Sequence, residues 1–402
     1  MKKVLSFSLF LMLGLVASQI LPGIMGDGYN SLKSYITNPL LYICLAFIMI
    51  NVGREFEINK KEWRSYTTDY FIAMATAALP WILIALYYVF VLLPSSLWSC
   101  GEAWKESLLL SRFAAPTSAG ILFTMLASLN LTRSWIYRKI QVLAIFDDLD
   151  TILLMIPLQI MMIGMRWQMV AMLSIVVLLL IIGWKRLDSY NVPQNWQSVL
   201  CYAAVIFGIT HVVYVTTSHW FGHENSVHIE VLLPAFVAGM VMKNVHIESV
   251  AEERASTTIS FLFMFLVGMS MPLVTGAALT ESAASAESVI SSIPMMSWGE
   301  IAIHVLLVSI LSNVGKLMPL FFYRDRRISE RLAVSVGMFT RGEVGAGVIF
   351  IAISYNLGGN ALIISALTLV LNLILTGGFV VWVRNLALRS YDPNAVEPST
   401  TH

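Results

Sequence analysis

The sequence predicts an all-α polytopic membrane protein with about twelve transmembrane helices, and three observations lead to this fold class. Of its 402 residues, 57% are hydrophobic and only 12% are charged, whereas soluble domains usually carry about 25% charged residues. Apolar stretches of roughly 20 residues, the length needed to cross a bilayer, recur along the whole chain. Lysine and arginine gather in alternate connecting segments. Residues 1–402 are therefore expected to form a single membrane domain.

The expected helices follow the apolar stretches, with edges uncertain by several residues. Two of the stretches, 37–53 and 229–243, are short for a bilayer span. The longest polar connection, about 277–297, is rich in Ser, Ala and Glu. The expected spans are 4–25, 37–53, 67–94, 107–128, 139–164, 168–184, 197–217, 229–243, 256–276, 298–323, 332–355 and 361–385.

The distribution of positive charge predicts the orientation of these spans. With the N-terminus inside, 19 of the 25 Lys and Arg residues fall in cytoplasmic segments and three on the opposite side. The remaining three, Arg112, Lys316 and Arg341, fall within spans. Because short cytoplasmic loops are enriched in Lys and Arg, this split predicts an even number of spans with both termini cytoplasmic, including a short polar tail at 390–402.

Residues 1–20 also have the features of a signal peptide. Two lysines precede an apolar run, and Val16-Ala17-Ser18 offers a cleavage site. Cleavage would leave eleven spans and an outside N-terminus. Because the apolar run continues through Ile20-Leu21-Pro22, we expect the segment to be retained.

Several function classes lack support in the sequence. The net charge is +1, and no basic tract indicates a nucleic-acid partner. The three cysteines are scattered and form no CxxC pair, and the seven histidines form no HExxH motif. We therefore expect neither an enzyme nor a bound cofactor.

The adjacent carboxylates Asp147 and Asp148 are the strongest functional candidates. An ionisable side chain at the bilayer centre costs at least ~2.5–3.5 kcal/mol, and two neighbouring carboxylates disfavour each other's ionisation. Such a pair can hold a proton near neutral pH or, once deprotonated, bind Na+ or Li+ through hard oxygen ligands. The alternative is a solvated cluster at a helix end. Asp150, in the same stretch, could simply face water.

A lysine in a later span is the second candidate. Lys316 lies seven residues before Tyr323, so its side chain could extend to the membrane interface. Alternatively it forms an intramembrane ion pair with Asp147, which would lower the cost of both charges.

Two spans carry helix-breaking residues at corresponding positions of the two halves. The fourth span contains Pro116, Thr117 and Ser118, whose unwound carbonyls and hydroxyls are plausible cation ligands, although an ordinary proline kink is the alternative. The eleventh contains Arg341 and Glu343 among three glycines, and we favour a stabilising role for this pair over direct ion transport. Interrupted helices in two halves predict inverted repeats with a binding site at the midplane.

These motifs together resemble the monovalent cation/proton antiporter superfamily, and most closely its sodium/proton exchangers of the NhaA and NapA types. The resemblance rests on Thr117 to Ile121, on Phe146-Asp147-Asp148-Leu149, on Gly315-Lys316 and on Arg341 to Gly345. It runs from about residue 40 to 385. Ser118 stands where many relatives have Asp, and Asp150 is also unusual.

The resemblance implies a fold and a mechanism. Asp148 would be the principal site for Na+ or H+, Asp147 would pair with Lys316 in one state, and Thr117 and Ser118 would line the unwound crossing. A core, about 66–164 and 298–385, would move like an elevator against a dimerisation part, about 1–55 and 197–276.

The resemblance also implies partners and a location. The partners would be Na+, or Li+ or K+, the proton, the lipid bilayer and a second copy of the chain, in a bacterial inner membrane with a role in pH homeostasis. Two alternatives remain: a Na+-coupled solute symporter of related fold, and a K+/H+ antiporter.

Overall fold

The computed structural model describes residues 2–54, 63–127, 134–163, 167–186, 189–221, 231–242, 250–271, 289–290, 293–354 and 357–390. Throughout these ranges the chain is helical apart from turns and one isolated bridge between Tyr190 and Met242. The elements are α1 (Lys2–Met25), α2 (Asp27–Leu32), η1 (Lys33–Thr37), α3 (Asn38–Arg54), α4 (Trp63–Tyr87), η3 (Tyr88–Leu92), η4 (Ser95–Leu97), α5 (Gly101–Ser111), η5 (Arg112–Ala114), α6 (Ala119–Ala127), α7 (Trp135–Ile163), α8 (Trp167–Lys185), α9 (Trp196–Phe221), α10 (Leu232–Val241), α11 (Val250–Ser270), α13 (Trp298–Gly315), α14 (Pro319–Phe322), α15 (Ile328–Gly337), α16 (Glu343–Ser354) and α17 (Gly359–Ser390).

The predicted all-helical architecture is confirmed, and each of the twelve expected spans contains at least one of these helices. Within the described ranges, seven helical stretches are long and apolar enough to cross a membrane. The fourth and eleventh expected spans are each divided, into α5 and α6 and into α15 and α16. The expected span 298–323 matches one apolar stretch, Trp298–Phe322, in which a turn separates α13, ending at Gly315, from α14, beginning at Pro319.

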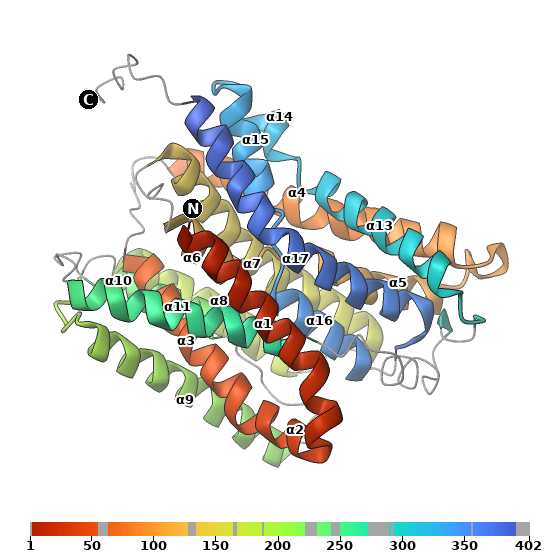
Figure 1. The fold of residues 1–402 in the computed structure, drawn as a ribbon, viewed down its shortest axis with the longest axis horizontal. Helices are drawn as coiled ribbons and strands as arrows, with labels where there is room; N and C mark the ends of the chain where they lie inside the picture. The colour runs from red at the N-terminus through yellow and green to blue at the C-terminus, as the bar shows by residue number, and fades with distance from the viewer. Residues whose placement is uncertain are drawn as a thin grey trace.

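The helices pack in two groups (Figure 1). In one group α1 lies against α11, and α3 contacts α9, α10 and α11. In the other group α4 contacts α7 and α13, and α17 contacts α13 and α15. The groups meet where α1 contacts α17 and where α3 contacts α6. The interrupted helices α5–α6 and α15–α16 belong to the second group.

Glycines allow very close backbone contact within the first group. Gly53 on α3 and Gly239 on α10 face each other, so that a Cβ on Gly53 would collide with the carbonyl oxygen of Phe236 and a Cβ on Gly239 with that of Ile50. Small residues at helix crossings permit this approach in membranes, where packing replaces the hydrophobic effect between helices. α3 and α10 therefore form a tight, glycine-dependent pair.

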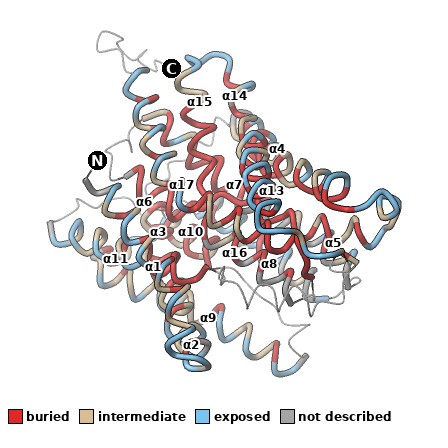
Figure 2. The backbone as a smooth tube through the Cα atoms, turned by 45° about the vertical axis from the view of Figure 1, so that its right-hand side comes forward, coloured by how far each residue is buried: buried red, intermediate tan, exposed pale blue. Residues whose placement is uncertain are grey.

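The outer helices expose apolar side chains while the centre is buried (Figure 2). On α9, Val205, Ile209 and Val212 are 53–63% exposed, and Ile303 and Ile310 on α13 are 59% and 61% exposed. Apolar surface on this scale is unfavourable in water but matches a lipid environment. In contrast, Asp147, Lys316, Arg112 and Arg341 are at most 1% exposed and lie in the second group.

Candidate functional site

The two interrupted helices meet at their non-helical segments. In the first, the chain leaves η5 and has no regular secondary structure from Pro116 to Ser118, before α6 begins. In the second, non-helical residues follow α15 up to Gly342. The Ser118 N–H donates to the Thr340 carbonyl oxygen at 3.1 Å, and the Thr117 hydroxyl donates to that of Met338 at 3.2 Å. Backbone groups freed by unwinding thus find partners across the crossing, as membrane burial requires.

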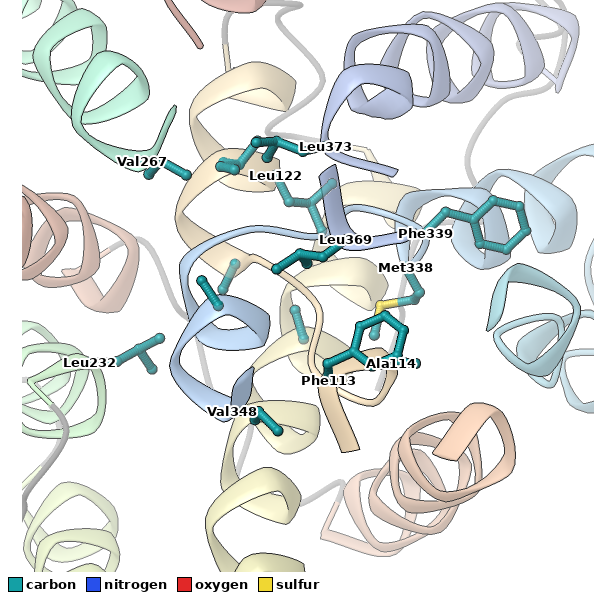
Figure 3. Close-up of a cluster of buried hydrophobic side chains, with 14 of the residues drawn as sticks. Phe113, Ala114, Leu122, Leu232, Val267, Met338, Phe339, Val348, Leu369 and Leu373 are labelled. Carbon is teal, nitrogen blue, oxygen red and sulfur yellow. The ribbon is translucent and has the colours of Figure 1, made fainter. Parts of the chain in front are cut away.

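The crossing is tightly packed. A Cβ on Gly342 would come within 2.8 Å of the Ser118 Oγ, so this position of the second interruption requires glycine for the first to approach. Apolar side chains from both segments, including Phe113 and Met338, belong to one buried cluster (Figure 3). Pro116 is itself buried and has no N–H to satisfy, which makes it compatible with an unwound segment in this environment.

Asp147 on α7 and Lys316 form a direct ion pair at this crossing. Lys316 Nζ lies 3.0 Å from Oδ1 and 2.9 Å from Oδ2 of Asp147, and both side chains are 0% exposed. Lys316 also donates to the Thr117 hydroxyl at 3.1 Å, and the Thr117 N–H donates to Asp147 Oδ2 at 2.7 Å. The carboxylate is therefore held jointly by a lysine and by the unwound backbone.

The break between α13 and α14 positions the lysine. Gly315 packs directly on α4, where a Cβ would lie 2.6 Å from the Cα of Pro80. Lys316 is the C-terminal cap of α13, and its side chain points into the protein rather than extending to an interface. The sequence did not indicate that the lysine would sit at a helix end.

Two arginines are also buried beside the crossing. Arg341, 1% exposed, donates through Nη1 to the carbonyl oxygens of Met338 and Thr340 at 3.0 and 3.4 Å. Arg112, 0% exposed, donates through Nη2 to the carbonyl oxygen of Asp150 at 3.1 Å. Sequence reasoning gave Arg112 no role, although its position inside an apolar span was the available signal.

Of the other predicted site residues, the structure describes the side chains of some and not of others. Asp150 is 1% exposed, so it does not face water. Asp148 lies in α7 and Glu343 begins α16, but their side chains fall outside the part of the chain that the structure describes. Ser118 is 1% exposed and lies within the crossing.

A second, partly buried ion pair joins α7 to α4 away from the crossing, and the sequence did not reveal it. Lys139 Nζ lies 2.6 Å from Oδ2 of Asp69 on α4, and the Tyr323 hydroxyl donates to Oδ1 of the same carboxylate at 2.8 Å. Lys139 Nζ is also 5.4 Å from the centre of the Tyr323 ring. A lone aspartate in the apolar stretch 67–94 was the signal that could have revealed this cluster.

Fold and site together define a class of protein. Discontinuous helices that cross at a buried carboxylate and lysine, inside a bundle with a lipid-compatible exterior, are the architecture of secondary membrane transporters. The transmembrane sodium/hydrogen exchanger family matches residues 3–385, so this chain belongs to that family.

Solved structures agree with this assignment at the level of the fold. The structure of the sodium proton antiporter MjNhaP1 from Methanocaldococcus jannaschii at pH 8 is 14% identical, with a TM-score of 0.56, and the alignment covers 96% of this chain and 92% of that chain. A structure of the same antiporter from an electron-microscopy map is 12% identical, with a TM-score of 0.57 and the same coverage. A search of curated protein sequences finds no match.

The family and the apolar helices make this chain a multi-pass integral membrane protein of the exchanger type. It is a transporter rather than an enzyme, and its substrates are a monovalent cation and the proton.

Proposed function

We propose that the chain exchanges Na+ for protons, with Asp148 as the principal ion site and Asp147 as its partner. The observation that carries the proposal is the fully buried pair between Lys316 and both oxygens of Asp147. A carboxylate held by a lysine inside the membrane has a countercharge that another cation or a proton can replace. The adjacent Asp148 supplies the second carboxylate at the same level of α7.

Electrostatic competition explains why one ion excludes another at such a site. Two like charges about 4 Å apart repel by about 4 kcal/mol at the effective dielectric of a protein. A sodium ion on the aspartates would therefore favour release of Asp147 by Lys316. Protonation of the carboxylates would remove the ligand that sodium needs, so the site would carry sodium or protons in alternation.

The other sodium ligands would come from the unwound crossing. Thr117 and Ser118 are buried there, with hydroxyl and carbonyl oxygens that are hard ligands suited to a dehydrated monovalent cation. Arg341 supports this segment by donating to the carbonyl oxygens of Met338 and Thr340. We assign Arg341, with Glu343, a stabilising role rather than a transporting one.

Alternating access would arise from movement between the two helix groups. The core, about 66–164 and 298–385, carries both interrupted helices and would move like an elevator against a dimerisation part, about 1–55 and 197–276. Support comes from the packing, because the ion pair and the crossing lie within one group and the glycine-dependent helix pair lies within the other.

The test is a pH-gradient assay in proteoliposomes, titrated in turn with Na+, Li+ and K+. We expect Asp148→Asn to abolish cation-driven proton movement in a protein that still elutes as a monodisperse species. The matched control is Asp325→Asn, because the Asp325 side chain is 77% exposed and remote from the crossing. Unchanged exchange in Asp148→Asn would rule out this residue as the carrier.

The same assay separates the alternatives. Exchange driven only by K+ would favour a K+/H+ antiporter. No exchange with any of the three cations, together with sodium-dependent solute uptake, would favour a symporter.

A further inference from the structure

A second carboxylate and a second cation lie beside the Asp147–Lys316 pair, and the exchange mechanism above does not use them. Arg112 begins η5, directly after the first half-helix α5, and its guanidinium carbon lies 5.0 Å from the centre of the Trp81 ring. Its one hydrogen bond within the described structure runs from Nη2 to the backbone of Asp150; Nε and Nη1 have no partner there. Two of the three guanidinium nitrogens of this buried cation therefore have no hydrogen-bond partner within the described structure.

The carboxylate of Asp150 is close enough to Arg112 to interact with it electrostatically. Asp150 follows Asp147 by three residues on α7, so the two lie on one face of the helix with Cβ atoms about 5–6 Å apart. The Asp150 Oδ2 has no hydrogen-bond partner in the described part of the chain, and Tyr70 on α4 lies near this carboxylate. Arg112 is within electrostatic range of Asp147 and, more weakly, of Asp150.

Arg112 creates a problem for a cation site. A guanidinium is always charged in proteins, and this one is completely buried, where charge interactions are poorly screened. Without a counter-charge it would repel any cation that approaches Asp147 and would compete with Lys316 for that carboxylate. A second carboxylate close to Arg112 would reduce this effect.

We propose that Asp150 is the counter-charge of Arg112 and thereby a positioning residue for cation binding. When Asp150 balances the charge of Arg112, Asp147 can interact with Lys316 or with the exchanged ion. The identity of the exchanged ion in this inference rests on the proposed function, whereas the pairing of Arg112 with Asp150 does not. It also assigns a role to a carboxylate that the family pattern does not require.

A purely structural role for Arg112 makes a different prediction. If the arginine only ties η5 to the backbone of Asp150, either substitution damages the protein in the same direction, and combining them brings no recovery. If charge balance is what matters, the two single substitutions shift cation affinity in opposite directions and cancel when combined.

The experiment is a double-mutant cycle on the apparent KM for Na+, measured in proteoliposomes at alkaline pH, where carboxylates are ionised. We expect Asp150→Asn to raise KM about tenfold, because the charge of Arg112 is then unopposed. Arg112→Gln should lower KM by a similar factor, and the double variant should return to within about threefold of the starting protein. Asp150→Glu, which keeps the charge, should also stay close to the starting value.

Two results would overturn the inference: unchanged KM in both single variants, or losses in the same direction that the double variant does not recover. Equilibrium binding of radioactive sodium to the purified variants repeats the cycle without any need for proton transport. Sodium binding that follows the cycle in a protein without exchange activity would refute the proposed function and leave the pairing intact. Asp148→Asn, with exchange abolished, provides the reference for complete loss.

Discussion

Two buried ion pairs on α7 differ in what surrounds them, although each joins an aspartate to a lysine. Asp147 pairs with Lys316 with both side chains 0% exposed, and Asp69 pairs with Lys139 at 2% and 19% exposure. Lys139 and Asp147 are eight residues apart, or about 12 Å along the helix. The first pair lies at the crossing of two unwound segments, whereas the second lies among continuous helices and aromatic rings.

Under the proposed function, the Asp147–Lys316 pair would open while the Asp69–Lys139 pair stays closed. Each oxygen of Asp69 has its own donor, Lys139 on one and Tyr323 on the other. The rings of Trp135 and Tyr323 pack edge to face at 5.5 Å beside it. Asp147, in contrast, shares Lys316 between both oxygens, and its Oδ2 also accepts from the Thr117 N–H of an unwound segment. We interpret the Asp69 cluster as the tie that keeps α4, α7 and the end of α14 together while Lys316 releases its partner.

The largest expected effect comes from removing the lysine of the central pair. Lys316→Gln leaves a fully buried carboxylate without its countercharge, and losing one partner of a buried pair typically costs about 3–5 kcal/mol. We expect the free energy of unfolding, measured in detergent, to fall by about this amount, and the current measured on solid-supported membranes during exchange to change.

Lys105→Gln is the matched control for this substitution. Lys105 pairs with Glu102 at the surface, where the side chains are 30% and 61% exposed, and such pairs contribute about 0–1 kcal/mol. If Lys316→Gln costs no more than this control and leaves the current unchanged, the central pair is neither a stabilising nor a transporting element.

An intermediate effect is expected at the fixed pair. Asp69→Asn removes the charge that Lys139 needs but keeps a polar group for Tyr323, so we expect a loss of about 1–3 kcal/mol. The apparent KM for Na+ should stay within about twofold of the starting protein, because the cluster lies about 12 Å along α7 from Asp147. A large change in KM with little change in stability would reverse the assignment of the two pairs.

The smallest effect is expected from Tyr323→Phe. This substitution removes one buried hydrogen bond to Asp69 while keeping the ring that packs on Trp135, and a single hydrogen bond contributes about 1 kcal/mol. Thermal unfolding in detergent measures the difference. A loss greater than that of Asp69→Asn would mean that the ring position depends on the hydroxyl.

Local sequence signals were sufficient for the helices and for the breaks in the fourth and eleventh spans. Each apolar stretch must satisfy its backbone hydrogen bonds internally in a bilayer, so hydropathy alone indicates the spans, and Pro116 and the glycines after Arg341 indicate where they unwind. The break before Pro319 was missed because the stretch 298–323 is apolar enough to be taken for one helix. The missed break matters because it places Lys316 at a helix end.

The sequence by itself determined that this chain is a helical membrane protein, and it marked Asp147, Asp148 and Lys316 as charges that require an explanation. The pairing of Lys316 with Asp147 was one of two readings of the sequence, and the tertiary structure decided for it. Only the tertiary structure showed Lys139 with Asp69 and Arg112 with the backbone of Asp150. The physical reason is the separation along the chain over which each effect acts. Hydropathy and helix breaking are properties of neighbours along the chain, whereas the partner of a buried charge is set by helix packing between segments as much as 254 residues apart.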